Sequence, residues 1–196
     1  MPYTGKKIEM ESSGGGGKGP GKYRFAVTRF ESRTSKKGNA WWSYDLKLYA
    51  PGDKEGFEVN YQAFFESMQD SMDAFLTVIG CTEAGIPFLR DDKDVEGKHG
   101  VVLMQHVEEL DKDDDAKIWN RLKPLRWGAW YHDDERSASE VNNGKDAESI
   151  MKNMDKCENI EGLWGKDKAR YEASMQSGGI PSTPAQEPAG NEDLPF

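Results

Sequence analysis

The chain has 196 residues, of which 36% are hydrophobic and 31% are charged, and its formal net charge is -9. With a mean hydropathy of -0.84, this composition indicates one modest core and much exposed chain. No apolar run approaches the roughly 18 residues of a transmembrane helix, and residues 1–22 lack the apolar centre of a secretory signal. Two cysteines, Cys81 and Cys157, do not support a disulfide scaffold or a cysteine zinc site, so we expect a reducing cytoplasm.

Charge is distributed unevenly along the chain. Residues 1–50 contain ten basic and four acidic residues, which leaves 16 basic and 31 acidic residues in the rest. Such an asymmetry indicates a nucleic-acid surface near one end and an acidic arm near the other. Charges solvated on an ordinary surface would produce a milder imbalance.

The first part of the chain has the pattern of a β-hairpin. Glycine-rich residues 1–22 predict a flexible leader, and apolar residues then alternate with a period of two from Tyr23 to about Phe30. A polar turn at residues 35–39 leads to a second strand that begins at Trp41. On that strand the predicted inner face carries Trp42, Tyr44, Leu46 and Leu48.

The pattern changes period after a third strand, which starts at Phe57. Apolar residues at spacings of three and four from Phe64 onward predict an amphipathic helix of about four turns that stops at Gly80. Residues 81–99 are expected to form loops.

Two further strands are predicted after this helix. Residues 101–107 are rich in strand formers, and a fifth strand can run from Ile118 to about Trp127, interrupted late by Pro124. Three strands, one helix and two strands is the element order of the OB-fold, a five-stranded Greek-key barrel. We therefore expect a mainly β fold with one helix between strands 3 and 4. The expected domains are a leader (1–22), an OB-fold domain (23–132), a polar, partly helical extension (133–176) and a disordered tail (177–196).

Single-stranded DNA needs cations for its phosphates and aromatic rings on which unpaired bases stack. Trp41 lies opposite the predicted inner face, beside the basic hairpin turn, so we expect its ring to be exposed. An aromatic and basic row on the fifth strand would extend the same groove. The candidate nucleic-acid-binding residues are Arg33, Lys36, Lys37, Trp41, Trp119, Arg121 and Lys123. Trp42 and Tyr44 are expected in the core, although one β-bulge would exchange the two faces.

We find no pattern typical of a catalytic, metal or cofactor site. The aspartate-rich turn from Asp111 to Asp115 lacks the glycine and glutamate spacing of an EF-hand, and we expect it to be solvated. His99, His106 and His132 have no spacing typical of zinc ligands or a catalytic triad. We therefore expect a protein that is not an enzyme and uses no cofactor.

The most specific motif is at the C-terminal end, Asn191-Glu192-Asp193-Leu194-Pro195-Phe196. Here acidic residues precede an apolar residue, a proline and a phenylalanine, after a flexible stretch. This segment resembles the acidic tip of bacterial and phage OB-fold single-stranded DNA-binding proteins. Residues 21–48 resemble the first hairpin of the phage proteins. The resemblance covers residues 21–130 and the tip, and it leaves residues 133–176 unaccounted for.

The resemblance implies a protein that coats and protects single-stranded DNA without sequence preference in phage replication, recombination or repair, in the host cytoplasm. It also implies that the tip recruits replication and recombination enzymes. The ring and the carboxylate of Phe196 suit an apolar pocket beside a basic residue on such a partner. The implied partner-binding residues are Glu192, Asp193, Leu194, Pro195 and Phe196. No membrane partner is expected. The long leader and few acidic tip residues depart from the bacterial pattern, so its tetramer is not carried over and a homo-oligomer stays open.

Two other hypotheses remain open at this point. The first is an adaptor in which the tail carries the function and DNA affinity is incidental. The second is a metal-dependent nuclease that uses the aspartate-rich turn. Removal of the tip and incubation of DNA with magnesium would distinguish these two from the coating protein.

Overall fold

The computed structural model describes residues 19–115, 117–158, 161–163 and 165–176. The predicted leader before residue 19 and the predicted C-terminal tip lie outside these residues. The chain divides into two compact units. The first runs up to Val107 and includes Arg121–Glu161, and the second consists of Glu108–Asn120 and the chain from Gly162 onward. Within the described residues, no helix is long and apolar enough to cross a membrane.

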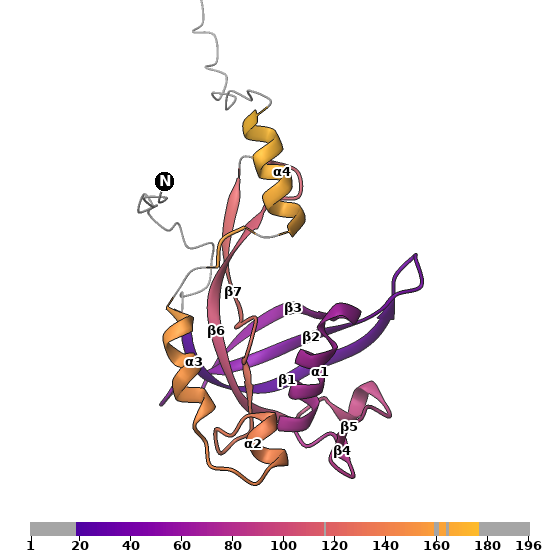
Figure 1. Ribbon diagram of the computed structural model, residues 1–196, viewed down its shortest axis with the longest axis vertical. Helices are drawn as coiled ribbons and strands as arrows, with labels where there is room; N and C mark the ends of the chain where they lie inside the picture. The colour runs from indigo at the N-terminus through magenta and orange to yellow at the C-terminus, as the bar shows by residue number, and fades with distance from the viewer. Residues whose placement is uncertain (1–18, 116, 159–160, 164, 177–196) are drawn as a thin grey trace, which may run out of the picture. The chain divides into compact units, whose positions relative to one another are not determined.

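An antiparallel sheet organises the first unit (Figure 1). Its strands follow the order β3-β2-β1-β6-β7, and β8 pairs with β6. The strands are β1 (Gly21–Thr34), β2 (Ala40–Tyr49), β3 (Phe57–Phe65), β6 (His99–Leu110), β7 (Ile118–Pro124) and β8 (Trp130–Tyr131). The sheet is nearly closed and barrel-like, as in an OB-type barrel, so the predicted mainly β fold is confirmed.

Two bulges bend this sheet on either side of β2. The pairing of β1 with β2 shifts register between Val27 and Arg29, and the pairing of β2 with β3 shifts between Tyr44 and Leu46. A bulge increases local twist and bends its strand, which helps the sheet to curve towards a closed barrel. It also changes the phase of β1, since Val27 and Phe30 are both buried although they are three residues apart.

The predicted helix is shorter than its apolar pattern suggests. A single 3-10 turn at Glu66–Met68 precedes α1 (Gln69–Val78), and the chain leaves the helix at Gly80 with φ +76°. Phe64, which we predicted in the helix, lies in β3 instead. Phe75 of α1 is at the centre of the core, with ring centroids 4.9–6.2 Å from its neighbours. These neighbours are Phe25, Phe30, Tyr44, Phe64 and Trp130.

The segment expected as loop, residues 81–99, contains a short hairpin of β4 (Thr82–Glu83) and β5 (Ile86–Pro87) and a 3-10 turn at Asp92–Asp94. It also provides partners for the edge of β1 beyond the region paired with β6. The Val27 amide donates to the Lys98 carbonyl at 2.8 Å, and the Ser32 amide donates to the Asp92 carboxylate at 2.7 Å. These bonds satisfy backbone groups that the sheet leaves unpaired.

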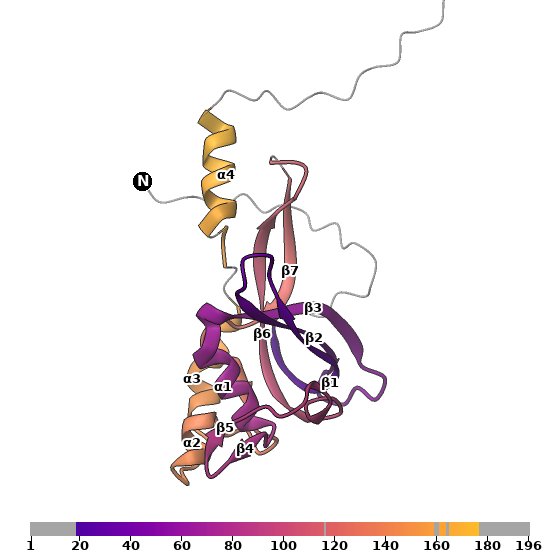
Figure 2. The same ribbon diagram turned by 90° about the vertical axis from the view of Figure 1, so that its right-hand side faces the viewer.

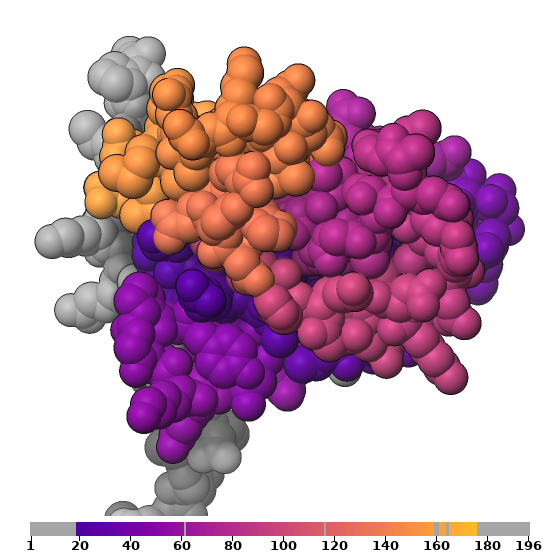
Figure 3. All heavy atoms as spheres, turned by 90° about the horizontal axis from the view of Figure 1, so that it is seen from below, coloured from indigo at the N-terminus to yellow at the C-terminus, as the bar shows by residue number. Residues whose placement is uncertain are grey.

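Helices follow β8 in the same unit, α2 (Ala138–Asn142) and α3 (Ser149–Cys157). Ile150 and Cys157 of α3 are buried and belong to the core, and α2 lies against α1. Figure 3 shows these C-terminal segments (orange) beside the segment around α1 (magenta), which is distant in sequence. The fifth strand ends at Pro124 rather than near Trp127, because proline has no amide hydrogen to continue a ladder.

In the second unit, α4 (Gly165–Gln176) lies beside the connection between β6 and β7 (Figure 2). Arg170 donates to the Asp111 and Lys112 carbonyls at 3.3 and 3.2 Å and forms an ion pair with Asp115. The Asp167 carboxylate accepts from the Leu110 amide at 3.2 Å. Polar contacts of α4 therefore hold it to the hairpin tip.

Candidate nucleic-acid interface

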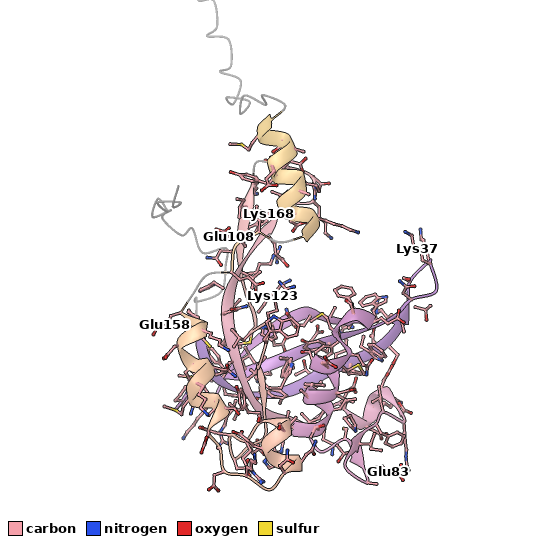
Figure 4. All side chains as sticks on the ribbon, viewed as in Figure 1. Lys37, Glu83, Glu108, Lys123, Glu158 and Lys168 are labelled. Carbon is pink, nitrogen blue, oxygen red and sulfur yellow. The ribbon has the colours of Figure 1, made fainter. Side chains whose placement is uncertain are left out.

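The β1–β2 turn presents two lysines at the end of an extended arm. The Ser35 amide donates to the Asn39 carbonyl at 2.9 Å, the Gly38 amide donates to the Ser35 carbonyl at 2.9 Å, and Gly38 adopts φ +86°. This closed turn places Lys36 and Lys37 at its outer positions, where both side chains are exposed. Neither lysine makes an ion pair with a residue that the structure describes. Figure 4 shows Lys37 at the tip of the arm, directed into solvent.

At the base of this arm, one row of the sheet brings together a cation and two aromatic rings. Arg33 is paired with Trp41 across β1 and β2, and Trp41 is paired with Phe65 across β2 and β3. The Arg33 guanidinium carbon lies 5.4 Å from the centroid of the Trp41 ring. The Trp41 and Phe65 centroids are 6.3 Å apart, with 29° between the ring planes. The three side chains share one face because directly opposed residues of a ladder point to the same side.

This row adjoins an open groove. The groove is lined by Ser35, Asn39, Ala40, Trp41, Phe65, Glu66 and Ser67 and has a volume of about 540 Å³. Phe65 is 54% exposed, an unusual state for a large apolar ring. Trp41 is half-buried and is outside the core, whereas its neighbour Trp42 packs against the core. The outward face of β2 thus presents flat apolar surface next to positive charge.

Carboxylates compensate Arg29 and Arg33 of this face, and Arg33 forms an ion pair with Glu31. Arg29 Nε donates to Asp45 Oδ2 at 2.6 Å and its Nη2 donates to Asp45 Oδ1 at 2.9 Å. The same guanidinium lies 3.0 Å from a Glu31 carboxylate oxygen. The hydrogen bond to Asp45 raises the pKa of Arg29, and the hydrogen bonds from Arg33 and Arg29 lower the pKa of Glu31. Arg29 is therefore a structural ion-pair partner rather than an open phosphate contact.

Phe65 is a site residue that the sequence reasoning missed. Phe64 fits the spacing of the helix as well as the alternation of β3, so the pattern alone does not show that the strand continues to Phe65. In the structure β3 continues to Phe65, so that Phe64 is buried and Phe65 is on the outer face. The adjacent phenylalanines at the boundary between two periods were the available signal, because adjacent strand residues point to opposite faces.

The structure does not gather all the predicted residues in one place. Arg121 and Lys123 are on β7 in the first unit, where Arg121 is exposed and Lys123 is half-buried. Figure 4 shows Lys123 apart from Lys37. Trp119 belongs to the second unit, where its indole N–H donates to Asp111 Oδ2 at 2.6 Å and Lys117 Nζ lies 4.0 Å from its ring centroid. Local partners therefore engage both the N–H group and the ring of Trp119.

The aspartate-rich turn is similarly engaged in local contacts. The pKa of Asp111 is lowered by hydrogen bonds from the Asp113 amide and the Trp119 indole, and Asp115 forms an ion pair with Arg170. Among the residues with described placement, no group of three or more His, Cys, Asp and Glu side chains is arranged to hold a metal ion. The turn thus fixes the tip of the β6–β7 hairpin.

No protein-family model matches the chain, and none of the curated proteins matches it either.

Proposed function

We propose that the protein binds single-stranded DNA without sequence preference through the outer face of β1, β2 and β3. The observation that carries the proposal is the row formed by Arg33, Trp41 and Phe65 at the base of a lysine-bearing arm. The rings of this row and the lysines of the arm combine ring surface with positive charge, the two features that unpaired nucleotides require.

The geometry supports stacking rather than reading of base edges. Trp41 and Phe65 offer apolar ring surface beside an open groove, and every base has a flat face that can lie on such a ring. Each base stacked on an aromatic side chain is worth about 1–3 kcal/mol by alanine substitution. Lys36 and Lys37 would contact phosphates, which carry no sequence information.

The biological role follows from this activity and from the family resemblance. We propose that the protein coats single-stranded DNA in phage replication, recombination or repair, in the cytoplasm of the host. The segment from Asn191 to Phe196, outside the described residues, would recruit partner enzymes. Its acidic residues would also be repelled by the DNA backbone, which keeps the segment available for a protein partner.

Fluorescence anisotropy with labelled single-stranded DNA, duplex DNA and RNA tests the proposal. We expect preference for single-stranded DNA over duplex, and a log–log salt dependence with a slope near -0.7 per phosphate contact. Replacement of both Lys36 and Lys37 with alanine should reduce the steepness of that slope by about 1.4. Lys145→Ala, an exposed lysine of the α2–α3 turn, is the matched control for loss of charge. Equal affinity for duplex, or binding that is insensitive to salt, would exclude the proposed function.

A further inference from the structure

We propose a second nucleotide-binding position at the opposite end of the same sheet face, formed by Tyr49, Arg24 and Lys47. This inference rests on the proposed function, because it extends the path of the same single strand. It assigns a ring and two cations to that path that the sequence did not single out.

The register of β1 and β2 places the new position on the same face as Trp41. Consecutive residues of β2 pair with β1, and the extra residue of the one bulge between the two strands is in β1. Because side chains alternate with a period of two, every second residue of β2 from Trp41 to Tyr49 faces outward. Arg24 is directly opposite Tyr49, just as Arg33 is directly opposite Trp41. Each end of the face thus pairs one arginine with one aromatic residue.

The cations at this end are available for phosphates. Lys47 Nζ lies 5.7 Å from the centroid of the Tyr49 ring, and the Arg24 side chain is exposed. Within the described part of the chain, neither makes an ion pair. This differs from the middle of the face, where Asp45 and Glu31 compensate Arg29. Of the nearby carboxylates, Glu135 is paired with Lys22 at 2.6 Å, Asp53 lines the adjoining hollow, and Glu58 is directly opposite Lys47 on β3.

Gly56 holds the Tyr49 ring in place from the β2–β3 turn. It adopts φ +67°, and a Cβ atom there would lie 2.8 Å from the Leu48 carbonyl oxygen and from Cδ1 and Cε1 of Tyr49. The turn backbone therefore packs closely against one edge of the ring, which only glycine permits. A ring held in advance loses little conformational entropy when a base stacks on it.

A hollow of about 260 Å³ adjoins this ring. Its lining includes Arg24, Tyr49, Asp53 and the Lys22–Glu135 ion pair. Its volume is below the roughly 300–1,000 Å³ of drug-sized ligand pockets, so it suits one base better than a larger molecule. Figure 3 shows the start of β1 (indigo) between the β2–β3 turn (purple) and the later segment (orange) on this side of the molecule.

The two positions are far enough apart to require a strand of several nucleotides. Trp41 and Tyr49 are eight positions apart along β2, which corresponds to about 26 Å at ~3.3 Å per residue. Site sizes of OB-folds range from about 4 to about 16 nucleotides. A short oligonucleotide can therefore occupy the Trp41 position alone, whereas a long one reaches both.

The test compares oligothymidylates of about 4 and about 16 nucleotides, the limits of that range, by fluorescence anisotropy. We expect Tyr49→Ala to weaken binding of the long oligonucleotide at least about fivefold and to leave that of the short one unchanged. Tyr49→Phe keeps the ring and should bind as wild type does. Replacing Arg24 and Lys47 with alanine should reduce the salt slope for the long oligonucleotide by about 1.4, and Lys145→Ala serves again as the charge control.

The outcomes separate this inference from the proposed function. If wild type binds the long oligonucleotide and Tyr49→Ala, still folded by circular dichroism, binds it equally well, the second position does not exist although the proposed function stands. Equal weakening for both lengths would also overturn it, because Tyr49 would then act through the first position. If wild type binds neither oligonucleotide, the proposed function itself fails.

Discussion

The Phe65 ring lies beside the Trp41 ring on the outer face of neighbouring strands, with 6.3 Å between the centroids. Neither ring belongs to the core, and Phe65 is more than half exposed. Two adjacent rings outside the core form an apolar patch, unlike a single scattered apolar residue, and such a patch indicates a binding surface that needs a functional reason. Stacking of unpaired bases supplies one.

Replacing Trp41 and replacing Trp42, the two tryptophans of β2, should have different effects. Trp41→Ala should weaken single-stranded DNA binding by about 1–3 kcal/mol and change the melting temperature little. Trp42→Ala should lower the free energy of unfolding by about 2–4 kcal/mol, because Trp42 packs against the core. Oligonucleotide titration and thermal denaturation of both variants check this. The reverse pattern would mean that the two faces of β2 have been exchanged.

Phe65→Ala should weaken DNA binding by about 1–3 kcal/mol, since it removes one of the two rings of the row. Ile86→Ala is the matched control, because Ile86 is also exposed and apolar but is on β5, away from the row. Anisotropy titrations of the two variants should differ at least about fivefold in affinity. Similar affinities would remove Phe65 from the site.

Asp45→Asn should destabilise the sheet more than it affects DNA binding. The substitution removes the two-pronged ion pair with Arg29, and neither side chain is well exposed. Loss of such charge-assisted bonds costs about 1–3 kcal/mol. Urea denaturation measures this cost. DNA affinity should stay about equal, because Glu31 still compensates the Arg29 guanidinium; a marked loss of affinity in the folded variant would contradict this assignment.

The Glu140 carboxylate should make stability fall in acid. Burial by itself would raise the pKa of Glu140, but hydrogen bonds from Ser137, Glu148 and Ser149 hold it well below the usual range. The ionised form is therefore stabilising above the unfolded pKa, about 4.3, and this contribution is lost as the pH falls toward the lower folded pKa.

Glu140→Gln should cost about 2 kcal/mol at pH 7, and the difference from wild type should shrink progressively below about pH 4. Urea denaturation across this pH range provides the measurement. Glu148→Gln is the control, because the Glu148 side chain is exposed. A difference between wild type and Glu140→Gln that does not vary with pH would refute the role of the charged carboxylate.

Arg170→Ala should loosen the second unit without unfolding the first. Arg170 contacts two carbonyls and the Asp115 carboxylate of the β6–β7 tip, and its loss should reduce amide-exchange protection in α4 about tenfold or more. Lys168→Ala, which removes an exposed cation from the same helix, should have little effect. Hydrogen-exchange mass spectrometry distinguishes the two; unchanged protection in Arg170→Ala would show that other contacts hold α4.

The regular parts of the fold were predictable because their periods are clear. Alternation identified the first three strands, and the helical spacing of Met72, Phe75 and Leu76 identified the buried face of α1. The end of β3 was not predictable in the same way, because Phe64 satisfies the period of two and also begins the spacing of the helix. Burial in the barrel decides between them, and burial depends on strands that are distant in sequence.

The candidate site was predictable to a similar extent. The outward position of Trp41 follows from the alternation of β2, and the turn lysines follow from glycine and polar residues. The bulge in β1 has no sequence signal of its own. The sequence therefore does not show that Arg29 is opposite Asp45 and forms an ion pair with it. Contacts between distant segments, such as the packing of Ile150 in the core, are likewise set by tertiary structure.

The bulges lie in the strands beside β2. The sheet can therefore curve while β2 keeps a strict alternation of inner and outer residues. Removal of Thr28 would restore strict alternation in β1 and leave Val27 and Phe30 on the inner side, at the cost of a flatter sheet. Removal of a residue within β2 would instead invert the remainder of that strand and direct Trp41 or Tyr49 inward. Changes in chain length should therefore be tolerated at the bulges and selected against in β2.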